Sequence, residues 1–289
     1  VVHTVHSLEP LRPWKREQLG CGYDMSSWIE RTSLGMADAV IAVSQGTKND
    51  ILEHFDIDPA KITVIYNGIN VDQYHPTEET TALDKFGVDP LKPIVLFVGR
   101  ITRQKGIVHL VNAVKYINPD AQVVLCAGAP DTREVLAEME AAVKHVRQEG
   151  CRNVIWIQEM VTKEEAIELY SHATVFCCPS IYEPFGIINL EAMACRTAVV
   201  ASAVGGIKEV VVDGVTGYLV PLEQLHVAPF EPVNPDAFSR DLAVAINKIL
   251  DNPELAEAMA AAGQKRARDV FSWSSIAQQT KRLYDSLVK

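Results

Sequence analysis

Short runs of apolar residues recur along the chain and are separated by longer amphipathic stretches. The runs lie at residues 1–5, 39–43, 62–66, 94–98, 122–127, 154–157, 174–178, 199–202 and 217–220. Strands whose residues are almost all apolar suit a parallel sheet that is covered on both faces. Because these strands alternate with helical stretches, the pattern predicts right-handed crossovers and a doubly wound α/β fold.

The amphipathic stretches between the runs are predicted to be helices. They lie at residues 107–116, 132–149, 163–172, 189–194, 235–251, 253–270 and 274–288. Ligands of doubly wound sheets bind beyond the carboxyl ends of the strands. Arg100, Glu159 and Glu183 each follow the end of a predicted strand. We therefore expect one crevice to collect their side chains.

A break in the pattern at residues 72–93 predicts a boundary between domains. This stretch begins polar and contains proline, as linkers do. Residues 1–75 hold too few strands to close a sheet, so we interpret them as the C-terminal part of a first Rossmann-like domain. About a hundred N-terminal residues would then be missing, judged from the usual size of such domains. Residues 76–273 are predicted to form a second Rossmann-like domain, and residues 274–289 a final helix.

The composition of the chain indicates which binding partners and which cellular compartment to expect. The chain has 289 residues, a net charge of −10 and six cysteines. An acidic chain does not favour nucleic acid or an anionic membrane as partner, and no apolar run approaches the ~20 residues of a membrane span. No signal peptide is recognised before the first strand. The cysteines form no Cys-x-x-Cys pair, so we expect reduced thiols, no zinc and a cytoplasmic protein.

Two glutamates frame the most informative segment, residues 182–193. Glu183 precedes a Pro-Phe-Gly turn, and Glu191 lies in the apolar helical run that follows. A helix that starts near Gly186 presents unpaired N–H groups and a positive dipole, which attract phosphate. The carboxylates could accept hydrogen bonds from hydroxyls on either side, and a nucleotide sugar has this plan of sugar, diphosphate and ribose. Two solvated helix residues are the alternative interpretation, since short motifs carry limited weight.

A second segment, residues 97–106, places two cations after a predicted strand. Gly99 and Arg100 form the turn at the end of that strand, and Lys105 stands near the start of the next helix. Arginine grips a phosphate with two parallel N–H bonds, and lysine adds a mobile point charge. These cations and a helix N-terminus could neutralise a leaving diphosphate. The alternative is that both are surface charges at a helix entrance.

These segments and the opening at residues 3–15 resemble the retaining glycosyltransferases of the glycogen/starch synthase and sucrose synthase superfamily. The opening reads His-Thr-Val-His-Ser-Leu-Glu-Pro-Leu-Arg-Pro-Trp-Lys, and it is similar to the actinobacterial-type glycogen synthase. That enzyme uses ADP-glucose, and some members make maltose 1-phosphate. The similarity covers the whole chain. It implies two facing Rossmann-like domains of the GT-B type, the first truncated, with the last helix returning to the first domain.

The resemblance also implies an activity. It indicates a hexosyltransferase that moves glucose, with retention, from ADP-glucose to an α-1,4-glucan or to glucose 1-phosphate. The acceptor would attack from the face of the leaving group, without a covalent enzyme intermediate. No cofactor and no metal ion are implied, because fixed cations and helix dipoles stabilise the leaving group instead.

Particular residues take roles through the resemblance. The catalytic residues would be Glu183, Arg100, Lys105 and His6. His6 would be the cleft histidine that contacts the transferred sugar, although a lone histidine after a strand is more often structural or exposed. The donor contacts would be Gly99, Arg100, Lys105, Gly128, Glu159, Met160, Glu183, Phe185, Gly186, Ile187, Ile188 and Glu191.

The chain departs from relatives in the turn after the helical run that contains Glu191. Residues 193–198 read Met-Ala-Cys-Arg-Thr-Ala, where relatives commonly have Met-Ala-Cys-Gly-Thr-Pro.

Three other functions are alternatives to ADP-glucose-dependent transfer. A nicotinamide-dependent oxidoreductase would need a Gly-x-Gly-x-x-Gly turn after a strand, and none is present. A truncated fragment that binds the nucleotide sugar without turnover is a second alternative. A donor with uracil or guanine as base is a third.

Overall fold

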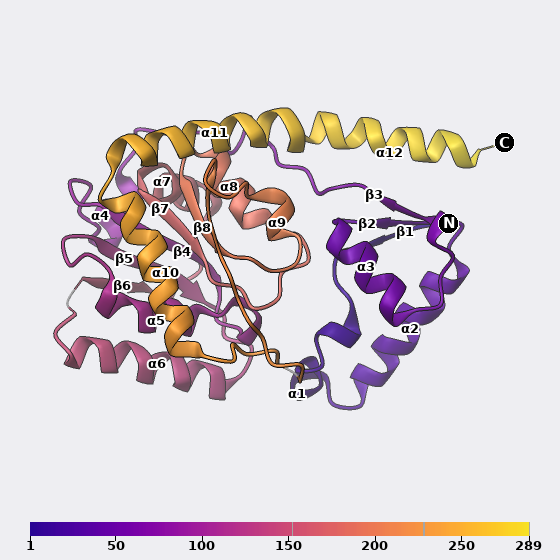
Figure 1. Cartoon of the computed structure of the whole chain (residues 1–289), viewed down its shortest axis with the longest axis horizontal. Coiled ribbons are helices and arrows are strands. Elements are labelled where there is room, and N and C mark those ends of the chain that lie inside the picture. The colour runs from indigo at the N-terminus through magenta and orange to yellow at the C-terminus, as the bar shows by residue number, and fades with distance from the viewer. Residues whose placement is uncertain (152, 228, 289) are drawn as a thin grey trace.

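The chain folds into two parallel sheets covered by helices, as the computed structural model of residues 1–151, 153–227 and 229–288 shows (Figure 1). The smaller sheet has the order β1-β2-β3 and comprises β1 (Val2–Val5), β2 (Ala39–Ala42) and β3 (Ile62–Val64). The larger sheet has the order β6-β5-β4-β7-β8-β9. We call the two units the small-sheet domain and the large-sheet domain. The predicted α/β class with two Rossmann-like sheets is confirmed.

The strands of the larger sheet are parallel, so their carboxyl ends lie along one edge of it. They are β4 (Ile94–Arg100), β5 (Gln122–Gly128), β6 (Val154–Ile157), β7 (Val175–Cys178), β8 (Ala198–Ser202) and β9 (Gly217–Val220). The strand order reverses between β4 and β7, which pair in parallel. In sheets of this kind the switch point is where ligands bind. The segments that follow β4 and β7 are the two singled out from the sequence.

Helices cover both faces of the larger sheet. One face packs against α5 (Ile107–Ala113), α6 (Arg133–Gln148) and α10 (Pro235–Leu250). The other packs against α7 (Lys163–His172), α8 (Ile187–Ala194), α9 (Ile207–Val210) and α11 (Pro253–Phe271). Within β4, Val95 and Phe97 enter the first core and Ile94 and Leu96 the second, because strand side chains alternate between faces.

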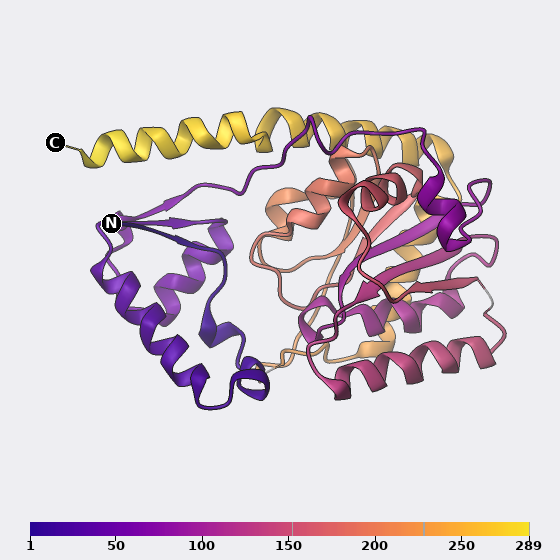
Figure 2. The ribbon, with the colours of Figure 1, turned by 180° about the vertical axis from the view of Figure 1, so that it is seen from behind.

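The small sheet is covered by chain segments from both ends of the sequence. Its helices are α1 (Lys15–Leu19), α2 (Gly22–Met36) and α3 (Gln45–His54), and Leu34 of α2 and Ile51 of α3 enter its core. On the other face, Ile276 of α12 (Trp273–Leu287) packs against Ile41 and Ile65. Helices α11 and α12 run end to end along both domains (Figure 2), so the C-terminal helix lies against the small-sheet domain.

The secondary structure differs from the expectation in several places, and α1, α2 and α3 of the small-sheet domain were not among the expected helices. A short helix, α4 (Thr81–Phe86), lies inside the segment predicted as a linker, with Leu83 fully buried. It is too short for an apolar period to show in the sequence. The helix expected over residues 107–116 ends at Ala113 and continues as a 3-10 turn over Val114–Tyr116.

The crossing between α11 and α12 is joined to the segment after β3. The amide of Ile69 donates to the carbonyl of Phe271 at 2.7 Å, and the amide of Trp273 donates back to Ile69 at 3.3 Å. Gly68 is packed so closely that a Cβ there would lie 2.6 Å from Cδ2 of Trp273. The crossing therefore depends on the absence of a side chain at residue 68.

Gly68→Ala is expected to lower the free energy of unfolding by about 1–3 kcal/mol, since overpacking a tight contact costs that much. Gly35→Ala is the control: Gly35 lies in α2 with open space around its Cβ position, and alanine in a helix is favoured by about 0.5–1 kcal/mol. Urea denaturation of both variants checks this. Equal stability of the two variants would contradict the packing argument.

Candidate active site

A partly buried ion pair lies at the switch point of the larger sheet. Nζ of Lys105 lies 2.7 Å from Oε2 of Glu183, and both side chains are largely buried. Lys105 belongs to the 3-10 turn η3 (Arg103–Lys105) after β4, and Glu183 to the loop after β7. Burial lowers the pKa of Lys105, but the adjacent Glu183 carboxylate more than offsets this and the pKa lies above its ordinary value. The structure thus brings together two of the predicted catalytic residues.

The turn that carries Lys105 depends on a glycine. Gly106 has φ +58°, and a Cβ there would lie 2.1 Å from the carbonyl oxygen of Pro179. The hydroxyl of Thr102 accepts a hydrogen bond from the amide of Lys105. The β4–α5 turn can therefore press against the end of β7, and this contact brings Lys105 within reach of Glu183.

The backbone of Glu183 rests on a pair of glycines after β8. The amide of Gly206 donates to the carbonyl of Glu183 at 3.0 Å. A Cβ on Gly205, whose φ is +46°, would lie 2.1 Å from that carbonyl oxygen, and one on Gly206 would lie 2.3 Å from the carbonyl oxygen of Pro184. The two glycines thus permit a close approach that fixes the Glu183 loop.

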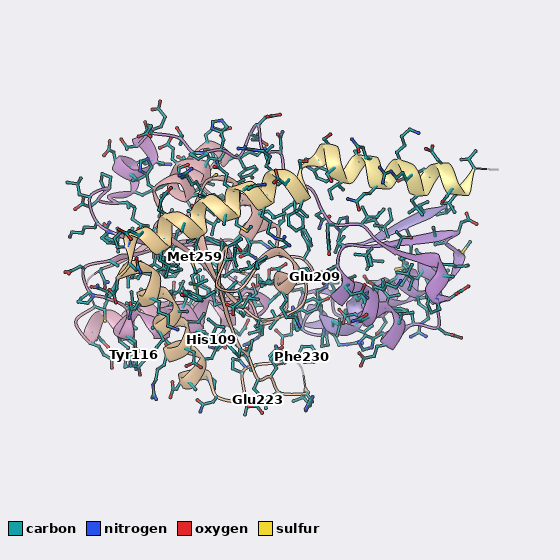
Figure 3. All side chains as sticks on the ribbon, turned by 45° about the horizontal axis from the view of Figure 1, so that its top comes forward. His109, Tyr116, Glu209, Glu223, Phe230 and Met259 are labelled. Atoms are coloured by element: carbon teal, nitrogen blue, oxygen red, sulfur yellow. The ribbon has the colours of Figure 1, made fainter. Side chains whose placement is uncertain are left out.

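The small-sheet domain holds the same loop from the other side. Ser44 Oγ donates to the carbonyl oxygen of Pro184 at 2.7 Å. The amides of Gln45 and Gly46, at the start of α3, donate to the Glu209 carboxylate at 2.8 and 3.0 Å. Glu209 lies on α9, at the boundary between the domains (Figure 3). We call these contacts the interdomain clamp; a carboxylate suits the positive end of the α3 dipole.

The start of α8 faces the ion pair. Gly186 has φ +94° at its N-cap, and no side chain of the described residues caps the helix there. Asn189 in the first turn is fully buried, and its Oδ1 has no partner among the described residues. A Cβ on Gly186 would lie 2.7 Å from Nδ2 of Asn189 and 3.4 Å from Cγ of Glu183. Asn189 was not predicted as a site residue, although it is the one amide side chain in an apolar run.

Glu191 lies deeper in α8 and is held by tyrosine. The hydroxyl of Tyr170 donates to its Oε2 at 3.0 Å. Burial raises the pKa of Glu191, and hydrogen bonds from Tyr170 and Tyr74 oppose that rise. The carboxylate is therefore oriented within the large-sheet domain instead of being solvated.

Arg100 and His6 are both exposed to solvent. Nη1 of Arg100 lies 3.0 Å from Oδ1 of Asp131, and its side chain is 64% exposed. The arginine can therefore move toward a ligand without leaving a buried gap. His6 follows β1 and is exposed. Neither residue contacts the Lys105–Glu183 pair among the described hydrogen bonds and ion pairs.

The remaining predicted donor contacts differ in what they can offer a ligand. Gly128 ends β5, and a Cβ there would lie 2.6 Å from the carbonyl oxygen of Gln158. Glu159 pairs with Lys85 at 2.7 Å, and Met160 is 75% exposed. The ring of Phe185 is buried against Tyr66 and Phe271, so only its backbone is available. Gly99 lies within β4, and Ile187 and Ile188 form the first turn of α8.

The carboxyl group of Asp50 on α3 makes the stability of the fold depend on pH. Burial raises its pKa from 3.8 to about 6, with His54 and Lys208 opposing and Glu53 adding to the rise. Between pH 3.8 and about 6 the unfolded chain ionises Asp50 while the folded chain keeps the proton, so stability falls as pH rises through this window. Asp50→Asn removes this loss of stability, because asparagine does not ionise.

We expect Asp50→Asn to raise the free energy of unfolding by about 1 kcal/mol at pH 7.5, after allowance for solvent screening, and to leave it unchanged near pH 3.5. Chemical denaturation at both pH values measures this. Asp56→Asn, at an exposed position of the same segment, should change neither value. A gain for Asp50→Asn that is equal at the two pH values would refute the titration argument.

Metal-type clusters and membrane-spanning helices are both absent from the described ranges. No group of three or more His, Cys, Asp or Glu side chains in them is arranged to hold a metal ion. Every helix of residues 1–151, 153–227 and 229–288 is too short or too polar to cross a lipid bilayer.

Two family descriptions match the chain, one on each domain. Residues 78–266 match "Glycosyl transferases group 1", and residues 1–73 match "Glycosyltransferase Family 4". Among curated relatives, the alpha-maltose-1-phosphate synthase of Mycolicibacterium smegmatis is 50% identical over 98% of this chain and 72% of its own. The D-inositol 3-phosphate glycosyltransferase of Corynebacterium aurimucosum is 30% identical over 98% of this chain and 65% of its own.

Solved structures share the architecture. The sucrose-phosphate synthase of Thermosynechococcus elongatus has a TM-score of 0.78 at 31% identity, over 99% of this chain and 67% of that one. Anabaena Alr3699/HepE, solved with UDP-glucose, has a TM-score of 0.79 at 22% identity, over 99% of this chain and 72% of that one. At 22% identity, the similarity to Anabaena Alr3699/HepE shows a shared fold only.

Proposed function

The chain belongs to the group 1 glycosyltransferases, and from this premise we propose that it is a retaining glucosyltransferase that takes glucose from ADP-glucose. The acceptor is an α-1,4-glucan or glucose 1-phosphate. The observation that carries the proposal is the Lys105–Glu183 pair at the sheet's switch point, beside the uncapped start of α8. A cation, a carboxylate and the start of a helix that no side chain of the described residues caps match a sugar joined to a diphosphate.

The diphosphate would lie between Lys105 and the first amides of α8. A lone carboxylate at this place would repel it, but the charge of Glu183 is compensated by Lys105 at 2.7 Å. Arg100 would exchange Asp131 for a phosphate oxygen, which its exposure allows. The unpartnered Oδ1 of Asn189 in the same turn is an acceptor, so it would accept a hydrogen bond from a sugar hydroxyl and would not contact the phosphates.

Glu183 would hold the hydroxyls of the transferred glucose. In the proposed reaction the bond from the anomeric carbon to the diphosphate breaks and the bond to the acceptor oxygen forms on the same face. The acceptor proton passes to the leaving phosphate oxygen. Fixed positive charge acts where negative charge develops, which is the largest electrostatic contribution available to such a site. Glu191, oriented by Tyr170 at 3.0 Å, would accept from the ribose.

The choice of ADP-glucose is supported by the sequence resemblance to the actinobacterial-type glycogen synthase. The base would meet the backbone at residues 158–160, at the end of β6. Backbone groups can read a donor and an acceptor on any base, so a UDP- or GDP-sugar is the competing donor.

A matrix of donors and acceptors tests the proposal. Calorimetry with ADP-, UDP- and GDP-glucose measures binding, and product analysis with maltoheptaose and glucose 1-phosphate measures turnover. We expect ADP-glucose to bind tightest and to give an α-linked product, with Glu183→Ala inactive. If ADP-glucose binds but is not turned over, the chain binds the donor without transferring glucose. If another nucleotide sugar binds more tightly, the proposed donor is wrong.

A further inference from the structure

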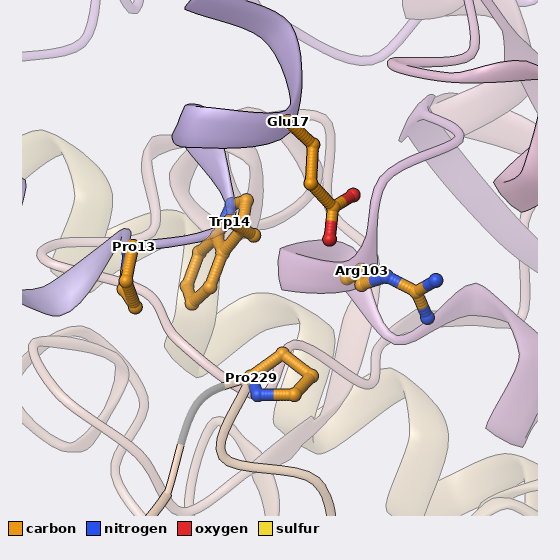
Figure 4. A pocket seen from close by; sticks show the side chains of 5 residues that line it. All are labelled: Pro13, Trp14, Glu17, Arg103 and Pro229. Carbon is orange, nitrogen blue, oxygen red and sulfur yellow. The ribbon is translucent and has the colours of Figure 1, made fainter. Parts of the chain in front are cut away.

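A continuous groove runs between α1 of the small-sheet domain and the start of α6 in the large-sheet domain. One part has a volume of about 380 Å³ and is lined by Pro13, Trp14, Glu17, Arg103 and Pro229 (Figure 4). The other has a volume of about 640 Å³ and is lined by Glu17, Gln18, Arg103, Asp131, Thr132 and Glu134. A narrow space shared by both sets of residues joins them.

The groove ends beside the candidate active site. The ring of Trp14 packs edge-on against Tyr182, with centroids 6.3 Å apart, and Tyr182 directly precedes Glu183. Arg103 lies in the same 3-10 turn as Lys105. Asp131, in the far part, is the partner of Arg100. A ligand in the groove therefore reaches the neighbours of three proposed catalytic residues.

The charge of the groove disfavours a phosphate. Glu17, Asp131 and Glu134 line it against one cation, Arg103, whose guanidinium already pairs with Glu138 at 3.3 Å. Hydrogen bonds from its own backbone N–H and from Thr132 lower the pKa of Glu134, so that carboxylate is charged. A phosphate would meet repulsion from two acidic residues that no described ion pair neutralises, Glu17 and Glu134.

The side chains suit a chain of neutral sugar rings. An indole offers an apolar surface to the C–H groups of a pyranose, and planar carboxylate, amide and guanidinium groups bind hydroxyls in pairs. The described residues hold no metal-type cluster here, so the carboxylates are free to accept from hydroxyls. Hydroxyl-rich neutral ligands are thus favoured by both shape and charge.

We propose that this groove binds the distal rings of a neutral oligosaccharide acceptor, with Trp14 as the aromatic contact nearest the transferred glucose. The inference rests on the proposed function, because it assumes that an acceptor enters from this side. It selects a glucan chain over glucose 1-phosphate as the ligand of the groove.

The test measures binding and turnover separately on the full chain saturated with ADP. Calorimetric titration with maltoheptaose should show saturable binding, whereas glucose 1-phosphate should not compete for it. Trp14→Ala should weaken maltoheptaose binding about tenfold, in line with the loss of one aromatic contact. ADP affinity should stay unchanged. Trp28→Ala is the matched control, since Trp28 is exposed on α2 of the same domain and should alter neither ligand.

Glu17→Ala covers the case in which Trp14→Ala does not fold. Glu17 is exposed, and its loss should weaken maltoheptaose binding about threefold through one lost hydrogen bond. Equal maltoheptaose affinity in all variants, or displacement of maltoheptaose by glucose 1-phosphate, would overturn the inference. Trp14-dependent binding without turnover of any donor would support the groove while contradicting the proposed activity.

Discussion

Replacing Lys105 by alanine is expected to lower kcat for glucosyl transfer by about a hundred- to a thousandfold, since removing one preorganised group that stabilises developing charge costs that much. The variant also leaves Glu183, a largely buried carboxylate, without its partner at 2.7 Å. We therefore expect the free energy of unfolding to fall by about 3 kcal/mol as well. Steady-state kinetics and urea denaturation measure the two effects.

Two further variants separate these effects. Adding Glu183→Gln to Lys105→Ala should recover part of the stability, because the uncompensated charge is gone, but none of the activity. Lys265→Ala is the matched control, since Lys265 pairs with Asp269 on α11 at the surface of the same domain. A Lys105→Ala variant with near-normal kcat would exclude Lys105 from stabilising the leaving group.

Gly205→Ala is expected to lower kcat by about a hundredfold, because a displacement of about 1 Å at a reacting group costs that much. The added methyl group would lie 2.1 Å from the carbonyl oxygen of Glu183, so the Glu183 loop must shift. The affinity for ADP should change little, because the amides of α8 remain. Kinetics and calorimetry on the same preparation distinguish kcat from donor binding.

Gly214→Ala is the control that separates the steric clash at Gly205 from the backbone strain of a left-handed alanine. Gly214 has φ +71°, also in the left-handed region, but nothing lies within 4 Å of its Cβ position. Both variants incur a strain of about 1–2 kcal/mol, whereas only Gly205→Ala displaces Glu183. Equal kcat in the two variants would show that the close approach does not position the carboxylate.

Much of the fold could be predicted because each strand is a local apolar run. The runs at residues 94–98 and 174–178 mark β4 and β7 to within two residues. Their pairing was not predicted, because β5 and β6 lie between them in the chain. The short helix α4 was missed, since one and a half turns show no period. Family membership was predicted from motifs that occupy these strand ends, and it is confirmed by the match over residues 78–266.

The candidate site was predictable only in part. The positions of Lys105 and Glu183 follow from the ends of two strands, but their direct pairing depends on Gly106 packing against Pro179, a contact between distant segments. Glu209 binds the start of α3 across 163 positions of sequence, and no local pattern announces such a partner. The residue roles assigned by resemblance remain predictions.

The interdomain clamp has a consequence for recombining these enzymes. Ser44 and the first amides of α3 come from one domain, while Pro184 and Glu209 come from the other. A chimera that joins this large-sheet domain to the small-sheet part of another enzyme would keep Lys105 and Glu183 but lose the hydrogen bonds that Ser44 and the first amides of α3 donate to Pro184 and Glu209. Transplanting residues 44–47 together with the large-sheet domain should therefore be the minimum graft that preserves turnover.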